Sequence, residues 1–364
     1  MLYCERSHCE RSHQDLLCQR CMLATTRKRV TIKDVAAEAG VSYQTVSRVI
    51  NHHASVRPET RARVLEAIER LNFRPNLAAR GLPQQRTFII GLVIPYEADY
   101  LFRDPHLLAQ ISGIDAEANA RGYNLLLSTE GGSGDDLEAF ERLLRNQVAD
   151  GVLVVETARS HAGCALLARE QYPFVSLGYA PGAPPSCAVH ANDREGARQA
   201  TLHLLKKGHR RIGIINGPPT GAVQAMEERL TGHRQALQEA GLTFDPTLMV
   251  YGDYTRPSGQ RATEQLLALP DPPTAIFAFN DRMAMGAIWA IRAAGRRVPD
   301  DIAVIGFDDI PAAADFSPPL TTVRQPSKEA GATATRILFD IIEGNPPPAT
   351  EVVLPAEFII RESA

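Results

Sequence analysis

Residues 42–51 read SYQTVSRVIN, and the apolar side chains of this stretch recur with the spacing of one helical face. At 100° per residue, Val46, Val49 and Ile50 share a face, and the polar side chains lie opposite. Ser42 stands just ahead of the first helical residue, where a hydroxyl oxygen can accept a hydrogen bond from a backbone N–H group. The stretch therefore predicts a short amphipathic helix that leaves a polar face outside.

Helices are also predicted on both sides of this stretch. Thr31, with Asp34 three residues later, gives a capping-box pattern, and Gly40 is a natural left-handed stop. A third helix is expected to begin at Pro58, because proline is tolerated in a first helical turn. Its apolar face is expected to carry Val64, Leu65, Ile68 and Leu71. Two helices joined by a short glycine-containing turn predict a helix-turn-helix unit.

The outward side chains of residues 42–51 suit the edges of DNA bases. A guanidinium such as that of Arg48 can bind guanine through two hydrogen bonds, and an amide such as that of Gln44 can bind adenine in the same way. Tyr43, at the flank of the first turn, can reach bases or phosphate. An ordinary solvent-exposed helix face is the alternative interpretation.

The charge distribution favours a nucleic-acid partner. The chain of 364 residues has a net charge of -3, yet residues 27–86 hold twelve Lys or Arg against five Asp or Glu. A basic segment joined to an acidic body suggests a nucleic-acid-binding module attached to another domain, although a solvated basic face would look the same. No apolar run approaches the roughly 18 to 20 residues of a membrane span, and a secretory signal is lacking. We expect a cytoplasmic protein with no membrane partner.

Four of the six cysteines lie in the first 21 residues, at Cys4, Cys9, Cys18 and Cys21. Only the last two have the CxxC spacing of a zinc-binding arm, and CERSHCERSH is a direct duplication. We therefore expect no metal site and no cofactor. Residues 1–29 are interpreted as a disordered extension, or as upstream sequence ahead of a true start at Met22.

The chain beyond residue 87 alternates apolar strands with helices. Runs of strand length occur at 88–94, 123–129, 151–157, 173–179, 211–217, 274–279 and 302–307. Continuous apolar strands between helices predict parallel sheets covered on both faces. FIIGLVIP and RIGIINGP look like the openings of two similar halves, so we predict an α/β body of two lobes with a cleft between them.

Polar and aromatic side chains follow several of these strands, where open α/β sheets bind ligands. They are Tyr96, Glu97, Glu156, Asn280, Asp281, Asp308 and Asp309. Each one alone is more often a helix cap or a loop residue, and Asp281 is interpreted in that way. Together they could converge on one cleft between the lobes.

Enzyme motifs are lacking. No GxSxG elbow, Walker loop or HExxH sequence occurs, and the GGSG cluster at 131–134 is typical of a flexible turn. We expect no catalytic residues. A sugar-binding receptor without a DNA-linked role is the alternative, because such receptors share a two-lobed body.

Two long stretches carry a family resemblance. VTIKDVAAEAGVSYQTVSRVIN and TRARVLEAIERLNFRPNLAARGL resemble the DNA-binding headpiece and hinge of the LacI/GalR family of bacterial transcriptional repressors. NDRMAMGA, VIGFDDI, PPLTTVRQP and FIIRES in the body are also family-like. The resemblance implies an all-α helix-turn-helix domain at 30–75 and a hinge helix and linker at 76–87. It also implies a two-lobed, periplasmic-binding-protein-like effector-binding and dimerisation domain of parallel sheets at 88–364.

The resemblance assigns roles in DNA binding by position. Base reading in the major groove falls to Tyr43, Gln44 and Arg48. Contacts at or near the DNA backbone fall to Thr31, Ser42, Ser47 and Asn51.

The hinge implies a second mode of DNA binding. Asn76 is the expected cap of a short helix, Arg80 lies near phosphate, and Leu82 is the wedge that enters the minor groove of palindromic operator DNA. Gly81 departs from the family pattern, and it raises the cost of ordering this helix by about 0.5 to 1 kcal/mol relative to alanine.

Effector-binding positions are implied in the body. The resemblance implies them at Arg229, Tyr254, Asn280 and Asp308. Tyr96 is expected to join them because it follows the first predicted strand, and Tyr100 and Phe102 are further contributors from a region, 96–105, that departs from the usual short form of the family. A carboxylate and a guanidinium suit adjacent sugar hydroxyls, and an aromatic ring covers the apolar side of a sugar. We expect a sugar or sugar derivative rather than a purine as the effector. We also expect a homodimer and no tetramer, because the chain lacks a heptad tail.

Overall fold

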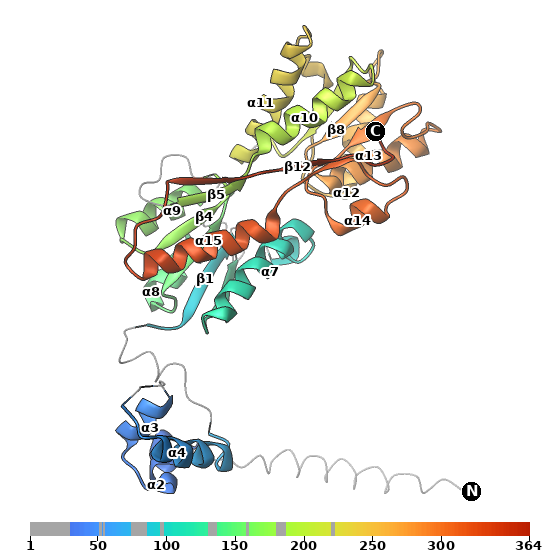
Figure 1. Cartoon of the computed structure of the whole chain (residues 1–364). Coiled ribbons are helices and arrows are strands. Elements are labelled where there is room, and N and C mark those ends of the chain that lie inside the picture. The colour runs from blue at the N-terminus through green and yellow to red at the C-terminus, as the bar shows by residue number, and fades with distance from the viewer. Residues whose placement is uncertain are drawn as a thin grey trace, which may run out of the picture. The chain divides into compact units, whose positions relative to one another are not determined.

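The computed structural model describes residues 30–50, 53, 55–73, 86–94, 98–129, 137–157, 160–179, 187–219 and 223–364. The chain divides into two compact units at residues 85 and 86, and each is treated by itself (Figure 1). The predicted extension at 1–29 lies outside the described residues, as do the hinge residues Asn76, Arg80, Gly81 and Leu82. None of the helices in the ranges above is long and apolar enough to cross a membrane.

Helices α2 (Ile32–Ala39), α3 (Tyr43–Ile50) and α4 (Pro58–Arg70) form the N-terminal unit. The Asp34 carboxylate accepts hydrogen bonds from the backbone N–H and the hydroxyl of Thr31, each at 2.7 Å. Gly40 ends α2 with φ at +62°, in the left-handed region. Both capping predictions are confirmed.

The small core of this unit is built from β-branched and small side chains. Val35 of α2, Val46 of α3 and Val64 of α4 are fully buried together with Ala67. The prediction for Leu65 is wrong, because its side chain is 48% exposed. Leu65 lies 100° around the helix from Val64, at the edge of an apolar face that three short helices cannot cover completely.

The first lobe of the body contains a parallel sheet with the strand order β11-β5-β4-β3-β1-β2. The strands are β1 (Ile89–Ile94), β2 (Asn124–Thr129), β3 (Gly151–Val155), β4 (Phe174–Leu177), β5 (Cys187–Ala191) and β11 (Glu351–Leu354). Helices α7 (Pro105–Ala120) and α15 (Ser327–Ile342) pack on one face. Helices α8 (Glu138–Asn146) and α9 (Ser160–Arg169) cover the other. The short helix α6 (Ala98–Leu101) precedes α7.

The second lobe contains a parallel sheet with the strand order β7-β6-β8-β9. Its strands are β6 (Ile212–Asn216), β7 (Met249–Tyr251), β8 (Ala275–Ala278) and β9 (Ala303–Ile305). Helices α10 (Asp193–Lys206) and α11 (Gln224–Glu239) cover one face, and α12 (Arg256–Leu267) and α13 (Asp281–Ala293) cover the other. The short helices η1 (Pro246–Leu248) and α14 (Pro311–Asp315) lie in connecting segments. The prediction of two α/β lobes is confirmed.

In the described part of the chain, three segments pass between the lobes. The first joins β5 to α10, the second joins β10 (Thr322–Arg324) to α15, and the third joins β11 to β12 (Glu357–Ile359). Strands β10 and β12 pair with each other in antiparallel fashion. Figure 1 shows the consequence: α15, late in the chain, lies beside α7 in the first lobe.

Every predicted apolar run forms a strand, but β5, β7, β10, β11 and β12 were not predicted. Strand β5 has the sequence CAVHA, whose histidine interrupts the apolar run although all five residues are buried. Strands β7, β10 and β12 are only three residues long. Strand β11 lies at a sheet edge and alternates exposed and half-buried positions.

Candidate functional site: the helix-turn-helix face and the pocket between the lobes

Helix α3 presents the polar face that the sequence predicts. Val46 and Val49 are buried, whereas Gln44 and Arg48 are exposed and the Tyr43 side chain is 54% exposed. Because the buried side fixes the helix on its neighbours, the opposite side is held open to a partner. Ser47 is half-buried and Asn51 lies outside the described residues.

The start of α3 is held by a side-chain cap. The Ser42 hydroxyl oxygen accepts a hydrogen bond from the backbone N–H of Thr45 at 3.2 Å and lies 3.0 Å from the Thr45 hydroxyl. Capping and phosphate contact are compatible roles, since other N–H groups of the first turn still point outward.

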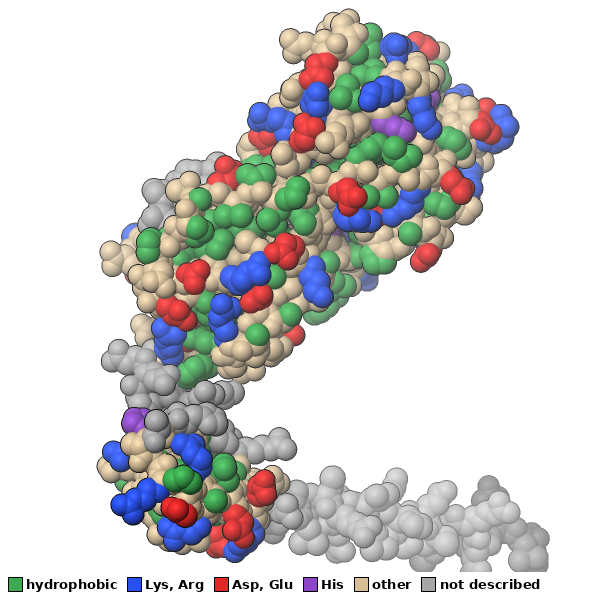
Figure 2. Space-filling model, viewed as in Figure 1, with side chains coloured by type: hydrophobic (Ala, Val, Ile, Leu, Met, Phe, Trp, Pro, Cys, Tyr) green, Lys and Arg blue, Asp and Glu red, His purple; other side chains and the backbone are tan. Residues whose placement is uncertain are grey.

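The basic side chains of the N-terminal unit differ in whether they form ion pairs within it. Arg70 forms ion pairs with Glu38 at 2.7 Å and Glu66 at 2.8 Å, so its charge is largely balanced within the unit. Lys33 and Arg63 are exposed, and Figure 2 shows several Lys and Arg side chains on the visible face of this unit. Over the visible face of the body, acidic and basic side chains are intermixed.

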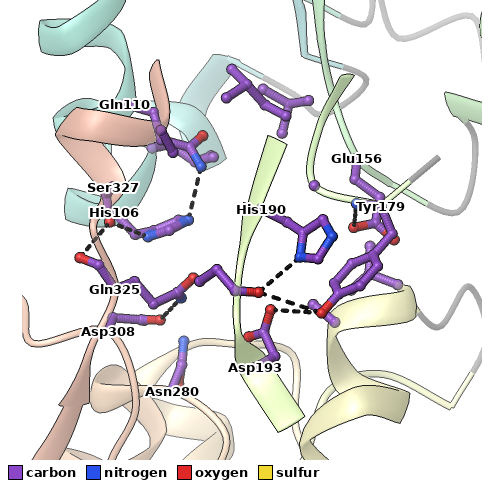
Figure 3. Close-up of a pocket in the computed structure, with 18 of the residues that line it drawn as sticks. His106, Gln110, Glu156, Tyr179, His190, Asp193, Asn280, Asp308, Gln325 and Ser327 are labelled. Carbon is purple, nitrogen blue, oxygen red and sulfur yellow. Dashed lines mark hydrogen bonds between the residues drawn. The ribbon is translucent and has the colours of Figure 1, made fainter. Parts of the chain in front are cut away.

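A cavity of about 140 Å³ lies between the lobes of the body. Its first-lobe wall comes from the start of α7 and the ends of β3, β4 and β5, and its second-lobe wall comes from α11 and the loops after β8 and β9 (Figure 3). Arg229, Tyr254, Asn280 and Asp308 all line it. Tyr96 lies outside the described residues, and Phe102 is 63% exposed and does not line the cavity.

Arg229 is the buried cation of the pocket. Its Nε donates to the Asp193 carboxylate at 2.7 Å, its Nη1 donates to the Phe279 carbonyl, and Nη1 lies 4.0 Å from the Asp308 carboxylate. The guanidinium also stacks 3.7 Å above the ring of Phe307. Arg229 therefore holds the Asp193 carboxylate through a charge-assisted hydrogen bond and places a positive charge near Asp308.

Asn280 is the N-cap of α13. Its side-chain oxygen accepts from the backbone N–H of Met283 at 2.8 Å, and its amide nitrogen donates to the Tyr254 carbonyl at 3.1 Å. Tyr254 is half-buried and has φ at +64°. A cap role and a place in the pocket wall thus coincide at Asn280.

Asp308 has a raised pKa. Burial raises the pKa of this carboxyl to about 7, although Arg229 opposes the shift. Its Oδ1 accepts from the side-chain amide of Gln325 at 2.7 Å. The same loop turns the neighbouring Asp309 away from the pocket, toward ion pairs with Arg324 at 2.8 Å and Arg361 at 2.7 Å.

The interpretation of Asp281 as a simple cap is wrong. Asn280 caps α13, and the fully buried Asp281 carboxylate accepts from the Thr322 hydroxyl and from the Ile310 backbone N–H at 2.9 Å. Burial raises its pKa well above the ordinary value, with Asp308 adding to the shift. Asp281 therefore anchors the loop that carries Asp308.

Glu156 connects the two lobes. Its Oε2 accepts from the Tyr179 backbone N–H of its own lobe at 2.8 Å, and its Oε1 accepts from the Gln224 backbone N–H of the second lobe at 2.7 Å. Burial raises the pKa of this carboxyl to about 7. A second link joins Asp104 at the start of α7 to Arg282 of α13 at 3.4 Å.

Sequence reasoning missed several pocket residues. They are Asp104, His106, Gln110, Tyr179, His190, Asp193, Gln325 and Ser327. His190 lies in β5, which was not predicted, and Asp193 is the first residue of α10, directly after that strand and the cap residue Asn192. His190 stacks on Tyr179 at 3.8 Å between ring centroids, and its Nε2 lies 2.6 Å from the Glu351 carboxylate.

A two-lobed body with a pocket between the lobes that polar and apolar side chains line, preceded by a helix-turn-helix unit, defines a ligand-responsive DNA-binding protein. Residues 31–76 match the family described as bacterial regulatory proteins of the lacI family, and residues 201–364 match a periplasmic binding protein-like domain. The chain is 39% identical to the HTH-type transcriptional regulator CelR of Thermobifida fusca, covering 93% of this chain and 99% of that protein. It is 37% identical to the HTH-type transcriptional repressor PurR of Aliivibrio salmonicida, covering 86% and 92%.

Solved structures agree with these sequence relatives. A CelR–cellobiose complex is 38% identical with a TM-score of 0.69 and covers 92% of this chain and 100% of its own. A lac repressor dimer bound to operator and the anti-inducer ONPF is 29% identical with a TM-score of 0.81, covering 92% and 99%. The chain belongs to the LacI family of bacterial transcriptional regulators.

Proposed function

We propose that this protein is a homodimeric repressor that binds palindromic operator DNA. Its affinity for the operator falls or rises when a sugar or sugar derivative binds between its lobes. Residues 30–75 form the proposed DNA-binding domain, 76–87 the hinge, and 88–364 the effector and dimerisation domain. Because DNA is the partner, the proposed site of action is the cytoplasm. No catalytic role is proposed.

The observation that carries this proposal is the pocket that both lobes enclose. A ligand that contacts Glu156 or Gln110 on one side and Asp308 or Arg229 on the other binds best at the separation of the lobes that lets it reach both walls. Differential affinity of that kind is what shifts a conformational equilibrium. A ligand in this pocket can therefore control the conformation of the body.

The donor and acceptor set of the pocket favours a polyhydroxy ligand. Carboxylates, an amide and a guanidinium stand beside the aromatic rings of Tyr179 and Tyr254. Each sugar hydroxyl both donates and accepts, and the rings can cover its apolar face. The relative CelR was solved as a cellobiose complex, which supports the same ligand class here.

The pocket volume bears on how the ligand enters. About 140 Å³ is well below the roughly 300 to 1,000 Å³ of typical ligand pockets, so a disaccharide needs lobes that stand further apart. The hydrogen bond from Gln224 to Glu156 is one contact that must then lengthen.

The proposed DNA contacts follow the exposed face of α3. Tyr43, Gln44 and Arg48 are the proposed base readers. Thr31, Ser42, Ser47 and Asn51 are proposed at the DNA backbone, with Asn76, Arg80 and Leu82 acting from the hinge.

Isothermal titration of the full chain tests the effector class. Cellobiose and D-glucose represent sugars, and adenine represents purines. We expect saturable binding of at least one sugar, at least about tenfold weaker in Asp308→Asn because one of the two acceptor oxygens is replaced by an NH2 group. Binding of adenine alone, or of no sugar, would contradict the proposal.

A further inference from the structure

The side chain of Gln110 has an unusual position on the first-lobe wall of the pocket. It is only 8% exposed, and its amide nitrogen lies 3.2 Å from Nε2 of His106. Among the residues that the structure describes, its Oε1 is a buried oxygen without a hydrogen-bond partner. Leaving a buried acceptor unpaired is costly, so this oxygen beside the pocket needs a donor from a water molecule or from a bound ligand.

Which end of the amide is left over depends on the tautomer of His106, which we assign from a series of hydrogen bonds. The Ser327 hydroxyl donates to the Gln325 carbonyl at 3.5 Å, and Ser327 Oγ lies 2.8 Å from His106 Nδ1 (Figure 3). Burial lowers the pKa of the His106 ring, which favours the neutral imidazole. With its proton on Nδ1 toward Ser327, Nε2 accepts from the Gln110 amide nitrogen, and Oε1 remains unpaired.

The helices α7 and α15, which carry these hydrogen-bonded side chains, are held close together. A Cβ atom at Gly113 of α7 would stand 2.0 Å from the Lys328 carbonyl of α15, and one at Gly331 would stand 2.2 Å from the Gln110 carbonyl. The two backbones are therefore in direct contact beside Gln110 and Ser327. The position of the amide is set by packed helices rather than by a loop.

The series of hydrogen bonds also reaches the opposite wall of the pocket. Gln325, whose carbonyl accepts from Ser327, donates through its own side chain to Asp308 at 2.7 Å. An acceptor of the first lobe and a carboxylate of the second are thus connected through one short segment between the lobes.

We propose that Gln110 determines specificity in this pocket by accepting a hydrogen bond from one hydroxyl of the bound sugar. His106 and Ser327 act through it as positioning residues. This inference rests on the proposed function, since it names the group that one hydroxyl of the effector meets. A ligand without a donor at that position binds less well, because the Gln110 oxygen stays unpaired.

Calorimetric titration of the full chain with cellobiose, D-glucose and their monodeoxy derivatives tests the inference. Gln110→Met keeps the length of the side chain and removes the amide. We expect the wild type to discriminate against one monodeoxy derivative by about tenfold or more, and Gln110→Met to lose that discrimination while binding the parent sugar about tenfold more weakly. The matched control is Gln238→Met, on the exposed side of α11, which should leave both measurements unchanged.

Three other results are informative. If the wild type binds a parent sugar and Gln110→Met keeps both its affinity and its discrimination, the inference is overturned while the proposed function stands. If the wild type binds none of these sugars, the proposed effector class fails and the inference fails with it. A general loss of affinity for every derivative by the same factor would mark Gln110 as structural and would also overturn the inference.

Discussion

Glu156 is a carboxyl whose protonation is tied to its surroundings. Both of its oxygens accept backbone hydrogen bonds, one from each lobe, yet burial still raises its pKa from 4.5 to about 7. Below about pH 7 the neutral form of Glu156 is therefore favoured in the folded chain. Its contribution to stability is complete below the unfolded pKa and is lost as the pH rises through about 7.

We predict that Glu156→Gln changes how stability depends on pH. The substituted amide does not titrate, so the wild type should lose up to about 3 kcal/mol relative to the variant between pH 4.5 and pH 8. Urea unfolding of both proteins across that range measures the difference. The titrating histidines and Asp308 are common to both proteins, so their effects cancel in the comparison. A difference in the free energy of unfolding that stays constant with pH would contradict the account.

Arg229 provides a second prediction at this scale. Arg229→Met leaves the buried Asp193 carboxylate without its ion pair, so the free energy of unfolding should fall by about 3 to 5 kcal/mol. Adding Asp193→Asn should recover part of the loss. The control is Arg194→Met, which breaks the more exposed pair with Glu228 and should cost no more than about 1 kcal/mol. Equal losses in the two single variants, measured by urea unfolding, would count against a buried ion pair.

At the scale of elements, α3 is expected to separate DNA affinity from stability. Gln44→Ala and Arg48→Ala remove exposed side chains, so each should weaken specific DNA binding by about 1 to 3 kcal/mol and leave thermal unfolding unchanged. Arg70→Ala is the control, because its charge already pairs with Glu38 and Glu66. Gel-shift titration and thermal melts measure the two effects. If Arg70→Ala weakens binding as much as Arg48→Ala, α3 is not the reading element.

Helices α7 and α15 give a packing prediction. Gly113→Ala places a methyl group 2.0 Å from the Lys328 carbonyl, so the helices must move apart. We expect a loss of about 1 to 3 kcal/mol in urea unfolding, together with weaker sugar binding, because Gln110 and Ser327 move with their helices. Ser112→Ala on the exposed side of α7 is the matched control. An unchanged free energy of unfolding would show that the helices do not touch at this point.

Elements also show what the sequence could and could not predict. Apolar runs such as 88–94 and 211–217 predict strands because the sheets are covered on both faces. Strand β5 was not predicted because His190 interrupts its apolar run, and the stacking of this buried histidine on Tyr179 is visible only in the structure. Asn280 and Asp308 could be placed in the pocket because each follows a predicted strand. Gln110 and Ser327 could not, since they meet only through helix packing between distant segments.

At the scale of the whole molecule, the body is built for coupling. Three segments connect its lobes in the described residues, and Glu156 and Asp104 add contacts that depend on how close the lobes stand. In the proposed function, a ligand between the lobes changes their separation, and a dimer carries that change to two DNA-binding units. The expected coupling free energy is about 1 to 3 kcal/mol.

The most direct test of this coupling is fluorescence anisotropy on DNA. Duplexes that the full chain enriches from a random library would be titrated with protein, with and without a saturating sugar that calorimetry shows to bind. We predict enrichment of a palindromic site whose affinity changes by roughly 5- to 150-fold with the sugar. Enrichment of no site, or an affinity that stays the same when the pocket is filled, would contradict control of DNA binding from the pocket between the lobes.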